Sequence, residues 1–176
     1  GHIVLPTTTT LGHLAALPVM ISPDDTVLVD IQSHASVHLA TDVLRGRSVT
    51  VRDLPHNDIA ALEAGVEKAT GEGACRVWYL ADGIYSMYGD VAPVHAIAEL
   101  MDRYPSLHVY LDDAHGFGTM GATGMGTGEH FGVQDKIDLY FSTFAKSMAG
   151  IGGFIASDTE IVDYLRYNMR SQTFAK

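Results

Sequence analysis

Two short apolar stretches of the sequence are followed by side chains that could do chemistry. Residues 109–111 stop at two aspartates, the first of which is Asp112, and His115 follows. Residues 140–144 are followed closely by Lys146. A short apolar run that ends in an acid is typical of a buried parallel strand. Since ligands bind beyond the carboxyl ends of such strands, we expect the acid, the imidazole and the amine to meet at one site.

An acid, an imidazole and an amine at one site indicate a particular kind of cofactor. They suit a ring nitrogen that must stay protonated, a ring oxygen that accepts a hydrogen bond and an aldehyde that an amine captures. Pyridoxal phosphate (PLP) has these needs. Taken singly, the residues allow other interpretations: Lys146 as an ordinary surface lysine, and Asp112 with His115 as a metal pair or a helix cap.

Further candidates lie near the start of the chain. Thr7 to Thr10 precede an apolar periodic segment at residues 11–20. Such threonines can cap a helix and leave its first amides free for an anion, although a simple cap explains them equally well. His34 follows the strand-like residues 26–30, where a lone histidine can also be structural. Five other histidines are interpreted as structural or exposed: His13, His38, His95, His108 and His130.

The elements that must position these residues alternate along the chain. Strands are predicted at residues 26–30, 48–52, 76–80, 109–111, 140–144 and 150–157. Helices are predicted at residues 11–20, 35–44, 58–66, 94–104 and 158–169, and residues 1–6 form an extended lead-in. This alternation predicts an α/β fold with a largely parallel sheet.

Residues 116–128 are rich in glycine and include a match to GxGxxG. A dinucleotide fingerprint would join its strand directly to a helix, whereas more glycine follows here. We therefore interpret the stretch as a loop whose backbone passes close to another group. A nucleotide-binding Rossmann module remains a distant alternative.

Composition limits the class of protein. The 176 residues suffice for one domain, and the net charge of -10 argues against binding to nucleic acid or to anionic membranes. The single cysteine, Cys75, excludes an internal disulfide and fits a reducing compartment. No apolar run approaches the ~18 residues of a membrane span. We expect a cytoplasmic protein without an integral membrane segment, and no metal site.

Five motifs then occur in the order seen in α-oxoamine synthases, which are PLP enzymes of fold type I. They lie at residues 33–36, 56–58, 85–90, 112–118 and 143–146. The chain resembles serine palmitoyltransferase, glycine C-acetyltransferase and 8-amino-7-oxononanoate synthase over nearly its whole length. The resemblance implies a three-layer α/β/α fold with a mostly parallel sheet, the large domain of PLP-dependent transferases of fold type I.

The resemblance also implies roles around the cofactor ring. Lys146 would hold PLP as a Schiff base, and Asp112 would pair with the ring nitrogen. His115 would contact the ring hydroxyl oxygen, and Ser86 would lie beside the ring. His34 would stack on the ring and orient the substrate carboxylate. We expect four of these residues to act in catalysis: Lys146, His34, Asp112 and His115.

The phosphate end is implied in the same way. Thr143 would contact the phosphate, together with backbone amides near Thr9 and Thr10. The family usually has a serine-glycine pair where this chain has Thr8, Thr9 and Thr10, so close approach of the backbone is less assured here.

The implied reaction is decarboxylative acyl transfer. An acyl thioester, on coenzyme A or an acyl carrier protein, and an amino acid would give an α-amino ketone in a homodimer. Family members are about twice as long as this chain. Residues 1–176 would then be most of the PLP-binding large domain, without the N-terminal segment and the C-terminal small domain, and apolar faces should be exposed. The alternatives are another fold-type-I enzyme (aldolase, lyase or aminotransferase) and an inactive truncated fragment that serves as a structural or dimerisation module.

Overall fold

The computed structural model describes residues 2–174. Within them, seven strands form one sheet in the order β1-β7-β6-β5-β4-β2-β3. Strands β2 to β6 are parallel, and β7 runs antiparallel to both β6 and β1. The strands are β1 (His2–Val4), β2 (Thr26–Asp30), β3 (Thr50–Leu54), β4 (Val77–Asp82), β5 (Leu107–Asp112), β6 (Leu139–Thr143) and β7 (Gly153–Ser157).

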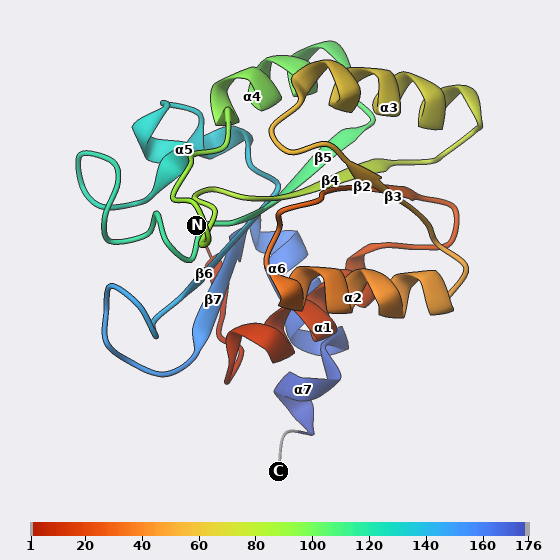
Figure 1. The fold of residues 1–176 in the computed structure, drawn as a ribbon. Helices are drawn as coiled ribbons and strands as arrows, with labels where there is room; N and C mark the ends of the chain where they lie inside the picture. Colours follow the sequence, from red (N-terminus) through yellow and green to blue (C-terminus); the bar gives the residue numbers. More distant parts are fainter. Residues whose placement is uncertain (1, 175–176) are drawn as a thin grey trace.

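Helices cover both faces of this sheet (Figure 1). Helices α1, α2 and α6 lie on one face, and α3 and α4 lie on the other. The predicted three-layer α/β/α fold is therefore confirmed. The helices are α1 (Thr9–Met20), α2 (Ala35–Gly46), α3 (Ile59–Gly71), α4 (Val94–Arg103), α5 (Thr127–His130), α6 (Thr159–Asn168) and α7 (Arg170–Thr173), with a 3-10 turn, η1 (Gln134–Lys136).

Alternation along the central strands divides the core into two parts. Trp78 and Leu80 of β4 pack toward α1, α2 and α6. Tyr79 and Ala81, which point to the opposite face, pack toward α3 and α4. Both sides of the sheet are thus removed from water, which explains why its strands are apolar throughout rather than alternating.

Two features of the chain differ from or refine the prediction. Residues 2–4, expected as a lead-in, form an edge strand that pairs with β7, and Val4 is buried. The glycine-rich stretch wraps around the buried carboxylate of Asp113. This agrees with its interpretation as a loop whose backbone passes close to another group. A Cβ atom at Gly126, whose φ is +100°, would lie 2.0 Å from Asp113 Oδ2. The same carboxylate accepts hydrogen bonds from the Thr127 amide (2.6 Å) and the Tyr140 hydroxyl (2.9 Å).

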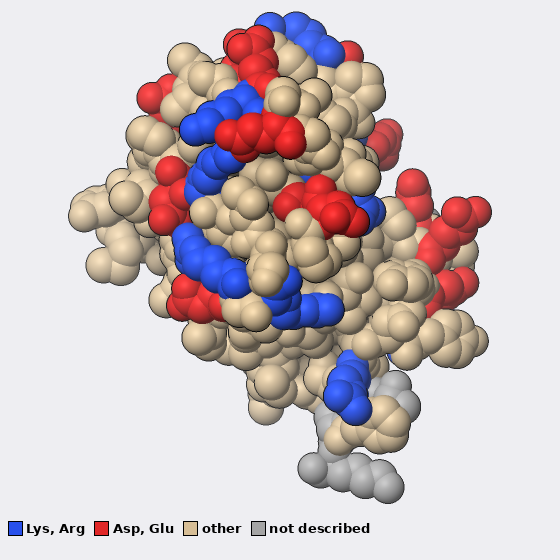
Figure 2. All heavy atoms as spheres, turned by 90° about the vertical axis from the view of Figure 1, so that its right-hand side faces the viewer, with Lys and Arg blue, Asp and Glu red and all other residues tan. Residues whose placement is uncertain are grey.

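The surface beside β3 mixes charges of both signs (Figure 2). Lysine and arginine side chains lie next to aspartates and glutamates on the face drawn in Figure 2. Residues of β3 form ion pairs, Asp53 with Arg45 and Arg52 with Glu72. Such charges suit the edge of a sheet, where they discourage further strand pairing. Large apolar side chains are exposed elsewhere, as expected, among them Ile151. None of the described helices is both long and apolar enough to cross a membrane.

Candidate active site

The carboxyl ends of β4, β5 and β6 open into a cavity of about 210 Å³. The start of α1 and the turn after β2 complete its wall. Every predicted site residue lines this cavity except Ser86. The lining consists of Thr9, Thr10, His34, Asp82, Asp112, Ala114, His115, Thr143, Ala145 and Lys146.

Lys146 and His115 are in direct contact in this cavity. Lys146 Nζ lies 2.7 Å from His115 Nε2. Partial burial lowers the pKa of Lys146, against the opposing charges of Asp112 and Asp82. Burial, and then the charge of Lys146, lowers the pKa of His115. Both shifts make the neutral forms of the amine and the imidazole more accessible than in water, which suits the pair to share a proton.

Asp112 is buried behind this pair and is held by two groups. Its Oδ1 accepts a hydrogen bond from the Ala114 amide (3.1 Å), and its Oδ2 lies 3.2 Å from His13 Nε2. The other ring nitrogen of His13 lies 2.7 Å from the Tyr110 hydroxyl. Burial alone would raise the pKa of Asp112, but His13 and the amide outweigh it and lower the pKa. Asp112 is therefore a carboxylate kept in its charged form.

His13 belongs to the site in a way that the sequence did not indicate. It was interpreted as structural or exposed, and it is fully buried in α1 with its ring 4.2 Å from that of Phe141. The available signal was its position one helical turn after Thr9 and Thr10. Its contact with Asp112, by contrast, spans most of the chain.

Asp82 is the second residue that sequence reasoning missed. It ends β4 directly beside Asp112 at the end of β5, and its Oδ1 accepts a hydrogen bond from the His34 amide (3.2 Å). Burial and the charge of Asp112 raise the pKa of Asp82 to about 8. Its position after a strand-like run was a usable signal, but only the strand order makes it a neighbour of Asp112.

The opposite end of the cavity is built for an anion. Thr8 caps α1 by accepting a hydrogen bond from the Leu11 amide (3.2 Å). The Thr9 and Thr10 amides lie in the first turn of the helix and have no acceptor among the described residues. The Thr9 hydroxyl donates to Thr143 Oγ1 (3.0 Å), which also accepts from the Ala145 amide (3.1 Å). Free amides at a helix start, with its positive dipole end, suit a phosphate group.

The two remaining candidates are His34, which lines the cavity, and Ser86, which does not. His34 caps α2, since its Nδ1 accepts a hydrogen bond from the Ser36 amide (3.2 Å), and its exposed ring lines the cavity. Ser86 is exposed in the loop after β4 and lies outside the lining. Its place beside a cofactor ring stays a prediction.

The donor set fits PLP. A charged carboxylate at one end suits a protonated ring nitrogen, and free amides at the other suit a phosphate. An amine of lowered pKa between them suits capture of an aldehyde. No group of three or more His, Cys, Asp or Glu in residues 2–174 is arranged to hold a metal ion, so the metal-pair alternative for Asp112 and His115 gains no support.

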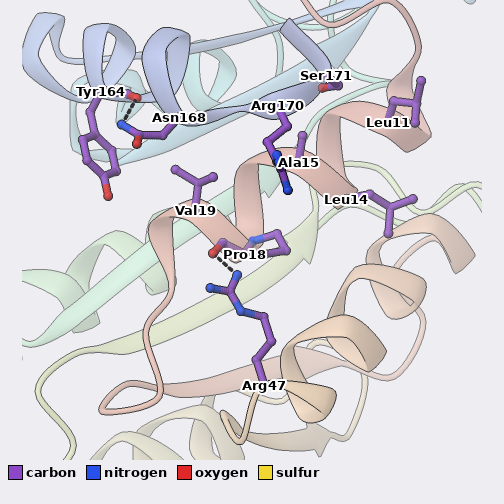
Figure 3. A pocket seen from close by; sticks show the side chains of 10 residues that line it. All are labelled: Leu11, Leu14, Ala15, Pro18, Val19, Arg47, Tyr164, Asn168, Arg170 and Ser171. Carbon is purple, nitrogen blue, oxygen red and sulfur yellow. Dashed lines mark hydrogen bonds between the residues drawn. The ribbon is translucent and has the colours of Figure 1, made fainter. Parts of the chain in front are cut away.

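A larger cavity, of about 620 Å³, lies away from this chemistry (Figure 3). It is a groove between α1 and the chain around α6 and α7, and the Arg47 guanidinium donates a hydrogen bond to the Pro18 carbonyl at its floor. Its walls carry arginines and apolar side chains but no carboxylate, histidine or lysine. The smaller cavity is therefore the candidate active site.

The chain is similar to known proteins over nearly its whole length. The model of the family "Aminotransferase class I and II" matches residues 2–176. A cysteate-C-fatty acyltransferase of Capnocytophaga ochracea is 41% identical over 171 residues, covering 94% of this chain and 39% of that protein. A serine palmitoyltransferase of Sphingobacterium spiritivorum is 36% identical over 164 residues, covering 93% and 40%. The chain thus spans about two fifths of the length of these relatives.

Solved structures are similar over the same region. A Sphingomonas wittichii serine palmitoyltransferase matches with a TM-score of 0.89 at 26% identity, over 98% of this chain and 42% of that one. A high-resolution structure of SPT with PLP matches with a TM-score of 0.88 at 25% identity, over the same shares of the two chains.

Proposed function

The chain belongs to the aminotransferase class I and II family, and from this we propose that it is the PLP-binding part of an α-oxoamine synthase. Such an enzyme transfers an acyl group from an acyl thioester to an amino acid with loss of CO2. One observation carries the proposal: the Lys146–His115 pair faces a charged Asp112 in a cavity that ends at the free amides of α1. The identity to named acyltransferases supports it.

The residues of the cavity would hold the cofactor as follows. Asp112, kept charged by His13 and the Ala114 amide, would hold the ring nitrogen in its protonated form. His115 would contact the ring oxygen, and Lys146 would hold the aldehyde carbon covalently. The Thr9 and Thr10 amides and the Thr143 hydroxyl would bind the phosphate. Bound PLP supplies an electron sink for a carbanion.

The proton transfers fall to residues of this chain. Once the amino group of the substrate has replaced Lys146 at the aldehyde carbon, Lys146 would be free as the amine that removes the Cα proton, a role that its lowered pKa favours. His115, 2.7 Å from Nζ, accepts a hydrogen bond from the ammonium that results. His34, exposed at the cavity rim, orients the substrate carboxylate.

Substrates, assembly and location complete the proposal. The names of two relatives specify a fatty acyl group but differ in the amino acid, cysteate or serine. We assign a long-chain acyl thioester and a small amino acid to this chain, with a homodimer as the assembly and the cytoplasm as the location. Ser86 is assigned a place beside the cofactor ring once the chain is in that assembly.

The cofactor is tested by adding PLP to the chain and to two variants. Lys146→Ala removes the proposed attachment point, whereas Lys136→Ala removes a surface lysine that pairs with Asp102. We expect an absorbance band at about 420 nm, and borohydride should abolish this band and leave the cofactor attached to Lys146 through a stable bond. Lys136→Ala keeps the band and Lys146→Ala loses it. A band that persists in Lys146→Ala would contradict the assignment of Lys146.

The reaction is tested separately by CO2 release from a carboxyl-labelled amino acid. Release that depends on a fatty acyl-coenzyme A supports the acyl transfer. Release or transamination without any thioester would identify another fold-type-I enzyme. PLP attachment without turnover would identify a cofactor-binding module whose chemistry needs further parts, which is an alternative because the chain spans about two fifths of its relatives.

A further inference from the structure

A second cluster of ionisable groups lies at the same edge of the sheet, outside the cavity lining. Its centre is Asp30, the fully buried last residue of β2. Asp30 Oδ1 accepts a hydrogen bond from the Gln32 amide (2.8 Å) and lies 2.9 Å from His56 Nδ1. Asp30 Oδ2 accepts from the Asn57 amide (2.8 Å). The second ring nitrogen of His56, Nε2, contacts the carboxylate of Asp90.

These contacts join three segments that are distant in the sequence. Residues 31–34 carry His34 into the cavity wall, and residues 55–58 carry His56 itself. Residues 83–91 form the loop after β4 that carries Ser86. Other contacts also hold the loop: the Tyr85 side chain is buried in the core, and the Tyr85 amide donates to the Asp90 carbonyl (2.9 Å). At the base of the loop, the Ala92 amide donates to the Gly83 carbonyl (3.0 Å) and Asn57 Nδ2 donates to the Val91 carbonyl (3.3 Å).

The geometry indicates the protonation state of His56. An imidazole can donate to carboxylates from both nitrogens only when both nitrogens carry a proton. Other groups near it are the Asn57 side-chain amide, whose Nδ2 lies 3.2 Å from Nε2, and the Tyr85 ring, whose centroid lies 4.3 Å away edge-on. Tyr79 of β4 lies near Asp30. Burial alone would lower the pKa of His56, but the hydrogen bonds to Asp90 and Asp30 outweigh it and raise the pKa.

We propose that His56 is a positioning residue: in its doubly protonated form it clamps the 83–91 loop to Asp30, the anchor whose carboxylate also holds the turn that leads to His34. The clamp goes beyond the acyl transfer proposed above and does not depend on it. Because the pKa of His56 is raised in the folded state, the clamp is complete below the ordinary histidine pKa. It is lost as the pH rises through the raised value, when one of the two carboxylates loses its donor.

Hydrogen exchange of the backbone amides in residues 84–91 tests the clamp on the full chain without added ligand. His56→Gln and Asp90→Asn are compared with His108→Gln, which breaks a similar pair with Asp138 (2.9 Å) at the opposite edge of the sheet. We expect the first two variants to speed exchange of these amides by about tenfold while β4 and β5 stay protected. His108→Gln leaves the loop unchanged.

An NMR titration of the His56 ring supplies a readout that a merely structural role would not move. We expect a pKa above the ordinary value of about 6.5 in the wild type and a lower one in Asp90→Asn. Wild-type loop exchange should accelerate, beyond its intrinsic base catalysis, over the same pH range. Three results would overturn the proposal: unchanged loop exchange in His56→Gln, acceleration spread evenly over the chain, or a His56 pKa at or below the ordinary value. PLP takes no part, so failure of the clamp and failure of the proposed function are distinguished.

Discussion

Aspartates and histidines lie at both edges of the sheet, but the aspartates have different neighbours at the two edges. At the amino edge, Asp25 is fully buried, pairs with Arg76 (2.9 Å) and accepts a hydrogen bond from the Ser22 amide (2.8 Å). Asp138 pairs with His108 (2.9 Å) and accepts from the Val109 amide (2.8 Å) in the same way. Each of these acids has a cationic partner or a histidine, together with an amide donor.

At the carboxyl edge, Asp30 and Asp112 also have histidine partners, but here two acids lie beside one another. Asp82 and Asp112 are register neighbours at the ends of β4 and β5, and both are buried. Burial and then the charge of Asp112 raise the pKa of Asp82, so one carboxyl of the pair gives up its charge more easily than the other. Paired charges at the amino edge stabilise the fold, whereas crowded like charges at the carboxyl edge cost stability and create an affinity for a cationic group.

The largest expected effect is on PLP affinity, which should depend on an acid at the carboxyl edge and not on an acid at the amino edge. Asp112→Asn should weaken PLP binding by about 10- to 100-fold, because a hydrogen bond to a charged group contributes about 1.5–3 kcal/mol. Asp138→Asn makes the same change at the amino edge and should leave the affinity unchanged. Titration with PLP, followed by absorbance, measures both. Equal losses in the two variants would break the comparison.

The second prediction concerns stability at the amino edge. Asp25→Asn removes the charged acceptor of Arg76 and should lower the free energy of unfolding by about 1–3 kcal/mol. Urea denaturation should show a lower midpoint with an unchanged slope, and PLP affinity should not change. A stability loss under about 0.5 kcal/mol would show that this pair is no more than a surface ion pair.

The third prediction concerns Asp82, whose replacement should raise the free energy of unfolding rather than lower it. Asp82 has a folded-state pKa of about 8, above the ordinary value near ~3.9, so the folded state binds its proton more tightly than the unfolded state. The contribution of Asp82 to stability therefore falls as the pH rises from about 4 to about 8. Asp82→Asn should be more stable than the wild type by about 1–2 kcal/mol at pH values above 8, and the difference should vanish toward pH 4. A variant that is less stable at every pH would place Asp82 with the amino-edge acids.

The smallest expected effect concerns the pKa of Lys146 inside the cavity. Because burial lowers the pKa of Lys146, competitive acetylation should show its amine reacting with a midpoint below that of an ordinary lysine. Asp112→Asn should move the midpoint further down, since Asp112 opposes the effect of burial. A midpoint at the ordinary value in both proteins would mean that the cavity does not desolvate the amine.

The pattern along the chain predicted much of this architecture. Strands and helices were recognisable because apolar periodicity is a local property, and polar residues behind a buried strand had to emerge at one edge of the sheet. Asp112, His115 and Lys146 were predicted in this way, and the order of the motifs added Thr143 and His34; all five line the cavity. The glycine-rich loop was also understood correctly, because repeated glycine signals a close approach of the backbone.

Other features depended on which strands became neighbours. The sheet places β4 between β5 and β2, and this order alone sets Asp82 against Asp112 and brings Asp90 to His56 across from Asp30. Tertiary packing also brings His13 into contact with Asp112 and pairs β1 with β7 in antiparallel orientation. The sequence by itself determined the longer helices and the central strands, the edge and the chemical types of the candidate site residues, because these follow from local periodicity. Only the tertiary structure decided which acid keeps its charge and which histidine clamps the loops, because burial and distant charges set those properties.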